Sequence, residues 1–351
     1  MIRSLINIFK VPDLKKKVLF TLALVGVYRL GAYIPTPGIN GAALGEFFDK
    51  IAKTQGGTLF GMMNMFTGGA ISQMTIFALG IMPYISSSII MQLLTVVIPQ
   101  LEKLAKEGGE HGRKVITQYT RYGTVVLALI QSFFISLYLE NPAHFGGIKM
   151  VDFTGWSFRL LTIITLCSGT AFIMWLGEQI TEKGIGNGMS ILITAGILSR
   201  IPTAGYQLMS KLSPLNPSKR EMDYITLLLM TVIGIAVVIS VIAITQGQRK
   251  IPVQYAKRII GRKIYGGQSA YIPIRVNHAG VIPIIFAQSI LMFPATIAGF
   301  IPNPAVQRMA TFLTKGQIVY SILYSLLIVF FAYFYTAITF NQVDVAVNMK
   351  K

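Results

Sequence analysis

A stretch that is apolar enough for lipid, yet carries a helix breaker and polar side chains, lies between Phe77 and Gln92. It reads FALGIMPYISSSIIMQ, with Pro83 near its middle and three consecutive serines from Ser86 to Ser88. A helix that only had to occupy a bilayer would need neither a kink nor a polar face, whereas a helix that lines a pathway or a movable contact uses both. The pattern therefore favours passage and movable contact over bond-making chemistry.

Side chains that could catalyse a reaction or bind a metal are few and scattered. His111, His144 and His278 fall in loops or at the edge of an apolar segment, without the spacing of metal ligands. Cys167 is the only cysteine, which excludes an intramolecular disulfide and a cysteine-based metal site. The glycine run 184–188 resembles a phosphate-binding loop, but no strand precedes it, so a tight turn at the membrane surface is the better interpretation. We expect no catalytic residue, no metal and no cofactor.

Composition indicates the environment in which these residues are positioned. Apolar residues make up 53% of the 351 positions and charged residues only 13%, against about 25% charged residues in soluble domains. Because the alternating segments of ~10 residues typical of membrane barrels are absent, we predict an all-α polytopic membrane protein. The predicted spans are 18–34, 73–98, 122–139, 158–177, 188–201, 223–245, 279–300 and 317–340. The fifth is short, but without it the charge pattern that follows would be inconsistent.

Lysine and arginine are distributed unevenly between the two sides that these spans define. Twenty of the 31 lie in one set of segments: 1–17, 99–122, 178–187, 246–275 and the C-terminus. Since loops rich in Lys and Arg remain in the cytosol, we expect the N-terminus and residue 351 both to be cytosolic. The first apolar segment is of spanning length and lacks a small-residue cleavage site, so we expect no cleavable signal peptide.

Charged side chains at membrane depth are nearly absent. Only Arg29 lies well inside a predicted span, and we expect its long side chain to reach the outer membrane interface. Proton- and ion-coupled transporters usually keep an ionisable relay at this depth. A small-solute secondary transporter, which also uses broken helices, is therefore the weaker alternative, and it would not need large basic loops. An intramembrane enzyme is a third reading, but no nucleophile–base pair lies at depth.

The loop 246–275 is the most basic part of the chain. Between Gln248 and Tyr265 it holds six cations among apolar and aromatic residues, in a segment long enough for a projecting hairpin. Topology signalling and contact with anionic lipids would explain part of this charge. A surface of this kind could also bind RNA phosphates or an acidic protein partner. No RNA-binding module motif is present, so we expect no sequence-specific binding of nucleic acid.

A segment between the first two predicted spans, 58–71, is apolar but too short to cross a membrane. It reads TLFGMMNMFTGGAI, and Gly68 and Gly69 offer a hinge into the second span. Segments of this length are interfacial or re-entrant. One interpretation is a half-helix on the outer surface; the other is a movable stopper folded into a protein-lined cavity, where irregular backbone is tolerated.

Taken together, these features resemble the SecY family, the large subunits of the Sec protein-conducting channel. The resemblance begins at about residue 15, and its most specific stretches are 77–92, 107–123, 175–190, 248–258 and 276–297. It implies two inverted halves of five helices each around an hourglass pore. The expected division is a cytosolic segment 1–17, a first half 18–201 with spans one to five, and a second half 202–351 with spans six to eight. The family has ten spans, so we expect this second half to be incomplete.

Functional residues follow from the resemblance position by position. The implied pore ring is Ile81, Ile85, Met189, Ile193 and Ile285. The implied plug is the segment 58–71, with Phe60, Met62, Met63, Asn64, Met65, Phe66, Gly68 and Gly69. The implied lateral gate lies between spans two and three and spans seven and eight, with Ser86, Gln92, Asn277 and Phe293. Pro83, Pro283 and Pro294 are expected to kink its helices. The implied docking residues are Arg249, Lys250, Lys257, Arg258, Arg262 and Lys263.

The function that the resemblance implies is passive conduction of polypeptides. Unfolded secretory chains would cross the membrane, and signal or transmembrane segments would leave sideways into lipid. The implied partners are SecE, SecG, the SecA ATPase, the ribosome, signal peptides and preproteins, together with anionic lipids. The implied location is the bacterial inner membrane, as a multi-pass protein without catalytic activity of its own.

Overall fold

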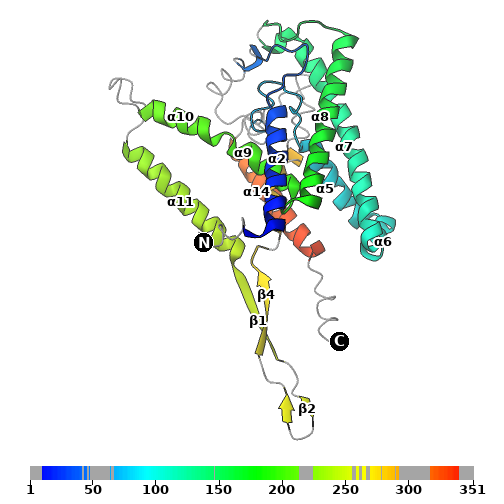
Figure 1. Ribbon diagram of the computed structural model, residues 1–351, viewed down its shortest axis with the longest axis vertical. Coiled ribbons are helices and arrows are strands. Elements are labelled where there is room, and N and C mark those ends of the chain that lie inside the picture. Colours follow the sequence, from blue (N-terminus) through cyan, green and yellow to red (C-terminus); the bar gives the residue numbers. More distant parts are fainter. Residues whose placement is uncertain are drawn as a thin grey trace. The chain divides into compact units, whose positions relative to one another are not determined.

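The computed structural model describes residues 10–41, 43–45, 47, 64, 67–145, 147–212, 224–254, 258–260, 263–265, 269–277, 279–288, 290–291 and 317–339. The chain forms two units, whose elements are labelled in Figure 1. The first comprises Met1–Ala204 and Ser289–Tyr320, and the second comprises Gly205–Gln288 and Ser321–Lys351. Helices dominate both units, which confirms the predicted all-α membrane architecture.

The first unit is built around one central helix. Its elements are α2 (Pro12–Gly31), α5 (Met82–Val97), α6 (Pro99–Glu107), α7 (Gly109–Glu140), the 3-10 helix η1 (Pro142–Phe145), α8 (Trp156–Lys183) and α9 (Gly188–Leu198). Helix α8 packs against α2, α5, α7 and α9. Small residues allow close packing on α8: a Cβ atom added at Gly177 would overlap the sulfur of Met189 in α9, and one at Gly169 would overlap the carbonyl oxygen of Ile76, which precedes α5.

The second unit contains a long apolar helix, α11, none of whose side chains is buried. Helix α10 (Ile201–Leu212) leads into it, followed by α11 (Tyr224–Gln246), the strands of the basic loop, the helical residues 282–288 and most of α14 (Gln317–Thr339). All side chains of α11 are exposed except half-buried Leu227, although the helix is strongly apolar, as expected of a helix that faces lipid. Phe286 packs edge-on against Phe331, with ring centroids 5.6 Å apart.

Several helices match the predicted spans. Among the described residues, α7, α8, α11 and Val319–Ala337 of α14 are long and apolar enough to cross a membrane. Helices α5 and α6 would add a fifth, as a pair bent by 105°. Helix α2 covers most of the first predicted span but begins among lysines, and α9 has only 11 residues. Of the seventh predicted span, only residues up to 291 belong to the described part of the chain.

The second predicted span is wrong over its first nine residues. Residues 73–81 form mostly buried turns instead of helix, and α5 begins only at Met82. Met74 and Gly80 have φ angles of 41° and 57°, which a right-handed helix does not allow. Apolar character alone predicted a helix here, but these φ angles prevent one. The turns are tolerated in an apolar segment because other parts of the protein cover them.

The expected proline kinks are also wrong at two positions. Pro83 lies in the first turn of α5, and Pro283 is the second residue of the helical stretch 282–288. At the first turn a proline costs no hydrogen bond, because the missing N–H would have had no partner within the helix. Both prolines therefore start helices. Pro294 lies outside the described residues.

The basic loop forms the expected hairpin. Strand β1 (Gln248–Gln254) pairs antiparallel with β4 (Ser269–Arg275), and β2 (Arg258–Ile260) pairs antiparallel with β3 (Lys263–Tyr265). Figure 1 shows β1 following directly from the end of α11. In the register Ile251 lies opposite Ile272 and Lys250 opposite Pro273, so successive residues alternate between the two faces of the ribbon.

Many hydroxyl groups are satisfied within their own helix. The side chains of Thr120, Thr124 and Ser132 in α7 donate to the carbonyl oxygen four residues earlier, at 2.6–3.0 Å. The same bond is made in α8, α9, α11 and α14 by Thr165, Thr181, Thr194, Thr231, Ser240 and Thr336. Ser87 of α5 differs, since its hydroxyl donates to the carbonyl oxygen of Thr120 in α7 at 2.7 Å.

Candidate functional site

A buried apolar cluster in the first unit brings together α2, the turns before α5, α8 and α9. We call it the Phe77 cluster, and its buried members are Tyr28, Ala32, Ala70, Phe77, Ile81, Ile173, Leu176, Ile180 and Leu192. The ring of Phe77 is stacked between two others, with centroid distances of 5.9 Å to Tyr28 and 6.1 Å to Phe172. The turns before α5 are thereby held by packing on both sides.

Four of the five expected ring residues lie at this cluster. Ile81 is a buried member with 8% of its surface exposed, and half-buried Ile85, Met189 and Ile193 pack against it. The N–H of Ile85 donates to the carbonyl oxygen of Ile81 at 3.1 Å, so the two residues share the first turn of α5. Ile285 belongs to the second unit, where it is half-buried and bonds to the carbonyl oxygen of Val281 at 3.3 Å.

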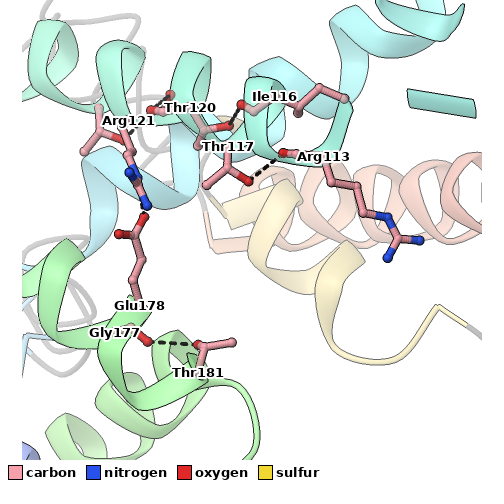
Figure 2. A network of polar contacts seen from close by, with 10 residues as sticks. Arg113, Ile116, Thr117, Thr120, Arg121, Gly177, Glu178 and Thr181 are labelled. Carbon is pink, nitrogen blue, oxygen red and sulfur yellow. Dashed lines mark hydrogen bonds and ion pairs between the residues drawn. The ribbon is translucent and has the colours of Figure 1, made fainter. Parts of the chain in front are cut away.

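The glycine run 184–188 positions Met189. The amide of Gly188 donates to the hydroxyl oxygen of Thr181, which in turn donates to the carbonyl oxygen of Gly177; both distances are 2.9 Å (Figure 2 shows the second bond). A Cβ atom at Gly188 would overlap the carbonyl oxygen of Gly177, and one at Gly177 would overlap the sulfur of Met189. The glycine run thus forms the tight turn expected from the sequence, and it lets α8 and α9 approach each other closely.

The two units share a short repeat that the sequence reading missed. Gly80-Ile-Met-Pro83 precedes and starts α5, and Gly280-Val-Ile-Pro283 precedes and starts the helical stretch 282–288. Both first glycines are left-handed, with φ angles of 57° and 65°. The repeat aligns Ile85 with Ile285, and Ile81 with Val281. The signal was present in the sequence, as a Gly and a Pro at the same spacing at both places.

The expected plug is described only at its end. Phe60, Met62, Met63, Met65 and Phe66 lie outside the described residues. Asn64 accepts hydrogen bonds from the amide of Gly69 through its carbonyl at 2.8 Å and from the amide of Ser72 through its side chain at 3.2 Å. Gly68 and Gly69 are both left-handed, and Ala70 is a buried member of the Phe77 cluster. The described end of the segment is thus packed against the cluster.

The two terminal nitrogens of the Arg29 guanidinium group lie in different surroundings. Nη2 donates to the hydroxyl of the exposed Tyr33 at 3.2 Å, and the group lies 5.3 Å from the Tyr33 ring centroid. The other nitrogen, Nη1, is buried and lies next to Gly68. The expectation that the side chain reaches the outer membrane interface stays a prediction.

The expected gate residues fall in different local settings. Ser86 is half-buried on α5, and exposed Gln92 donates to the hydroxyl of Ser88 at 3.5 Å. Asn277 forms a turn, accepting from the amide of Gly280 at 2.9 Å. Phe293 lies outside the described residues. The sequence reading did not single out Ser87, which contacts α7 where Gly123 leaves room for its hydroxyl.

Two ion pairs join α7 to α8, near opposite ends of α8. Figure 2 shows Nε of Arg121 donating to Oε1 of Glu178 at 2.7 Å. At the other end Nη2 of Arg159 lies 2.7 Å from Oε2 of Glu140, whose second oxygen accepts from the amide of Gly155 at 2.7 Å. In the part of the chain that the structure describes, no group of three His, Cys, Asp or Glu side chains could hold a metal ion.

The expected docking residues follow the hairpin. Arg249 and Lys250 are exposed neighbours on β1, and the strand geometry directs them to opposite faces. Arg258 belongs to β2 and Lys263 to β3. Lys257 and Arg262 lie outside the described residues.

Comparisons with known proteins converge on one family. The model of the SecY family matches residues 75–351. "Protein translocase subunit SecY" of Aquifex aeolicus is 44% identical over 344 residues, which cover 98% of this chain and 78% of that protein. A solved protein-conducting channel matches with a TM-score of 0.62 and 18% identity, over 92% of this chain and 71% of the other. The channel of a canine ribosome-channel complex matches with a TM-score of 0.55 and 19% identity, over 82% of this chain and 59% of the other.

Proposed function

The chain belongs to the SecY family, and on that premise we propose that it forms the pore of a Sec protein-conducting channel. It passes unfolded secretory polypeptides across the membrane and releases signal or transmembrane segments sideways into lipid. It acts as a passive conduit, without a chemical step of its own. The name of the relative, protein translocase subunit, and the fold shared with solved channels support this proposal.

The gathering of Ile81, Ile85, Met189 and Ile193 at the Phe77 cluster is the observation that carries the proposal. A collar of aliphatic side chains can close around a threaded chain and exclude ions by dewetting. The repeat Gly80–Pro83 and Gly280–Pro283 supports a contribution from Ile285 of the second unit, because it gives Ile85 and Ile285 the same place at the start of a helix.

In the proposal the plug 58–71 closes this collar at rest, and the lateral gate opens toward lipid. Packing of Ala70 in the Phe77 cluster supports the first assignment. Polar side chains such as Ser86 and Gln92 on α5 support the second, because hydrogen bonds between membrane helices contribute only ~0.6 kcal/mol each on average. A seam of that strength can open.

The basic hairpin is proposed to receive the partners that drive transport. These are the ribosome and the SecA ATPase, while SecE and SecG complete the complex in the bacterial inner membrane. Exposed Arg249 and Lys250 support an electrostatic docking surface. The canine channel with the same fold was solved in a complex with a ribosome, which agrees with this role. Both ends of the chain, residues 1–17 and 351, are proposed to be cytosolic, since the Lys- and Arg-rich segments lie on their side.

A site-specific crosslink tests the pore. In a Cys167→Ser background, Ile85→Cys is combined with a secretory polypeptide that carries one cysteine and is stalled in transit. We expect a disulfide between the two, because a chain in the pore must pass the collar. The measurement is the crosslinked fraction under mild oxidation.

Ile90→Cys provides the matched control, because it lies on the same helix but is 46% exposed. We expect little crosslinking there. Equal crosslinking at the two positions, or none at Ile85 while the polypeptide is demonstrably stalled in the channel, would reject the pore.

A further inference from the structure

Arg29 is a charged side chain to which the proposed function gives no role. It lies in α2, and residues before and after it, Tyr28 and Ala32, belong to the Phe77 cluster. Ionisable groups at such depth are costly and commonly mark functional contacts. The guanidinium group is held in one direction, because Nη2 donates to Tyr33 while the group lies over its ring.

That direction brings Nη1 to the glycine turn at the end of the plug segment. A Cβ atom built at Gly68 would lie 2.8 Å from Nη1 of Arg29 on one side and 3.0 Å from the carbonyl oxygen of Gly196 on the other. A Cβ atom built at Gly69 would lie 3.5 Å from Nη2 of Arg200. The turn is therefore enclosed between α2 and the end of α9, and its φ angles of 65° and 97° require glycine.

The enclosed nitrogen is not satisfied there. Nη1 is buried and has no hydrogen-bond acceptor among the described residues. A buried donor without a partner loses its hydration without replacement, and the loss is larger for a charged group. Movement of the turn away from Arg29 would open Nη1 to water. The packed arrangement is accordingly less stable with Arg29 than with an apolar side chain of similar length.

We propose that Arg29 is a positioning residue that keeps the Gly68–Gly69 turn easy to release, and so sets how strong a signal sequence must be to open the channel. This inference rests on the proposed function, in which the segment 58–71 is the plug. The guanidinium fork is essential to it, because one nitrogen is bound to Tyr33 while the other is directed at Gly68. A lysine has one ammonium head, which would turn to the exposed side of Tyr33 and leave the turn.

The test compares two preproteins in vesicles that contain the complete translocase with the parent chain or a variant. One preprotein has an intact signal, and the other has a charged residue in the apolar part of its signal. The measured quantity is the transport rate of the preprotein with the defective signal divided by that of the preprotein with the intact signal. A smaller amount of folded channel would lower both rates equally and leave this ratio unchanged. We expect Arg29→Met to lower this ratio about fivefold or more, as removal of an unsatisfied buried donor stabilises the closed arrangement.

Two further variants keep the result decisive. Arg29→Lys should lower the ratio as Arg29→Met does, and Lys149→Met, which removes an exposed cation, should leave it unchanged. A ratio that stays the same or rises in Arg29→Met, or parent-like behaviour of Arg29→Lys, would overturn the inference while the proposed function stands. Failure of the parent to transport even the intact preprotein would overturn the proposed function, and this inference with it.

Discussion

At the scale of single residues, the proposed pore ring consists of ordinary aliphatic side chains. An isoleucine that faces a pore and one that faces lipid are the same in composition, so periodicity cannot distinguish Ile85 from Ile90. The resemblance to the SecY family indicated which positions to expect in the ring, and the structure brings Ile81, Ile85, Met189 and Ile193 to one cluster. The turn before α5 could not be predicted from the sequence. This turn places Ile81 inside the cluster, where only 8% of its surface is exposed.

Replacing the collar with polar side chains should make the resting channel leak. We expect Ile81, Ile85 and Ile193 changed together to Ser to raise ion conductance several-fold, because hydroxyl groups let water wet a constriction that apolar side chains keep dry. The measurement is the resting ion flux of reconstituted vesicles. Ile90→Ser with Ile164→Ser is the matched control, since both residues are well exposed; a leak no greater than in this control would count against the ring.

At the scale of elements, α7 and α8 are joined twice, and the two joints differ in strength. The Arg121 and Glu178 side chains are 45% and 16% exposed, whereas those of Arg159 and Glu140 are 27% and 10% exposed. Glu140 also accepts from the amide of Gly155, the residue that precedes α8. One carboxylate therefore fixes both an arginine and the beginning of a helix.

The two joints predict an order of stability. We expect Glu140→Gln to reduce the free energy of unfolding by roughly 1.5–3 kcal/mol, because hydrogen bonds to a charged group are weakened in a shielded place. For Glu178→Gln we expect less than about 1 kcal/mol, since solvent screens the exposed pair. Denaturant unfolding in detergent micelles measures both variants. Equal losses, or a larger loss for Glu178→Gln, would show that burial does not set the order.

The sequence predicted most elements but not their beginnings. Long apolar runs located α7, α8, α11 and α14 because hydropathy reports the lipid-facing surface directly. The same reasoning failed at residues 73–81. The positive φ angles of Met74 and Gly80 exclude a helix there, and hydropathy does not report φ angles. It also mistook Pro83 for a kink, because a proline in the first turn of a helix and one in its middle look alike until the start of the helix is known.

At the scale of the whole molecule, charge is segregated from the apolar helices. Lys and Arg outnumber Asp and Glu by 31 to 13, and the longest basic loop is folded into a ribbon instead of being left open. The ribbon has two different faces: Lys250 shares one with Arg275, and Arg249 shares the other with Ile251 and Ile274. The sequence predicted the hairpin but not this division, which depends on the strand register.

The two faces can be tested separately by charge reversal. We expect Lys250→Glu to weaken binding of ribosomes or SecA more than Arg249→Glu, because it changes the face on which two cations lie together. The difference should be large at low salt and should shrink as salt screens the charges. Co-sedimentation with membranes across a salt series measures it. Affinities equal to the parent in both variants would remove the hairpin from docking.

The hydrogen bonds between side-chain hydroxyls and carbonyl groups of the same helix have a consequence for the insertion of this protein into the membrane. Thr165 in α8 and Ser240 in α11 donate to carbonyl groups of their own helix, so these two hydroxyls need no partner from a neighbouring helix or from lipid. Such segments can enter lipid one at a time, in the order of synthesis, and assemble afterwards. Ser87 is different, because its acceptor is on α7. Biogenesis of the α5 region is therefore complete only when α7 has arrived beside it.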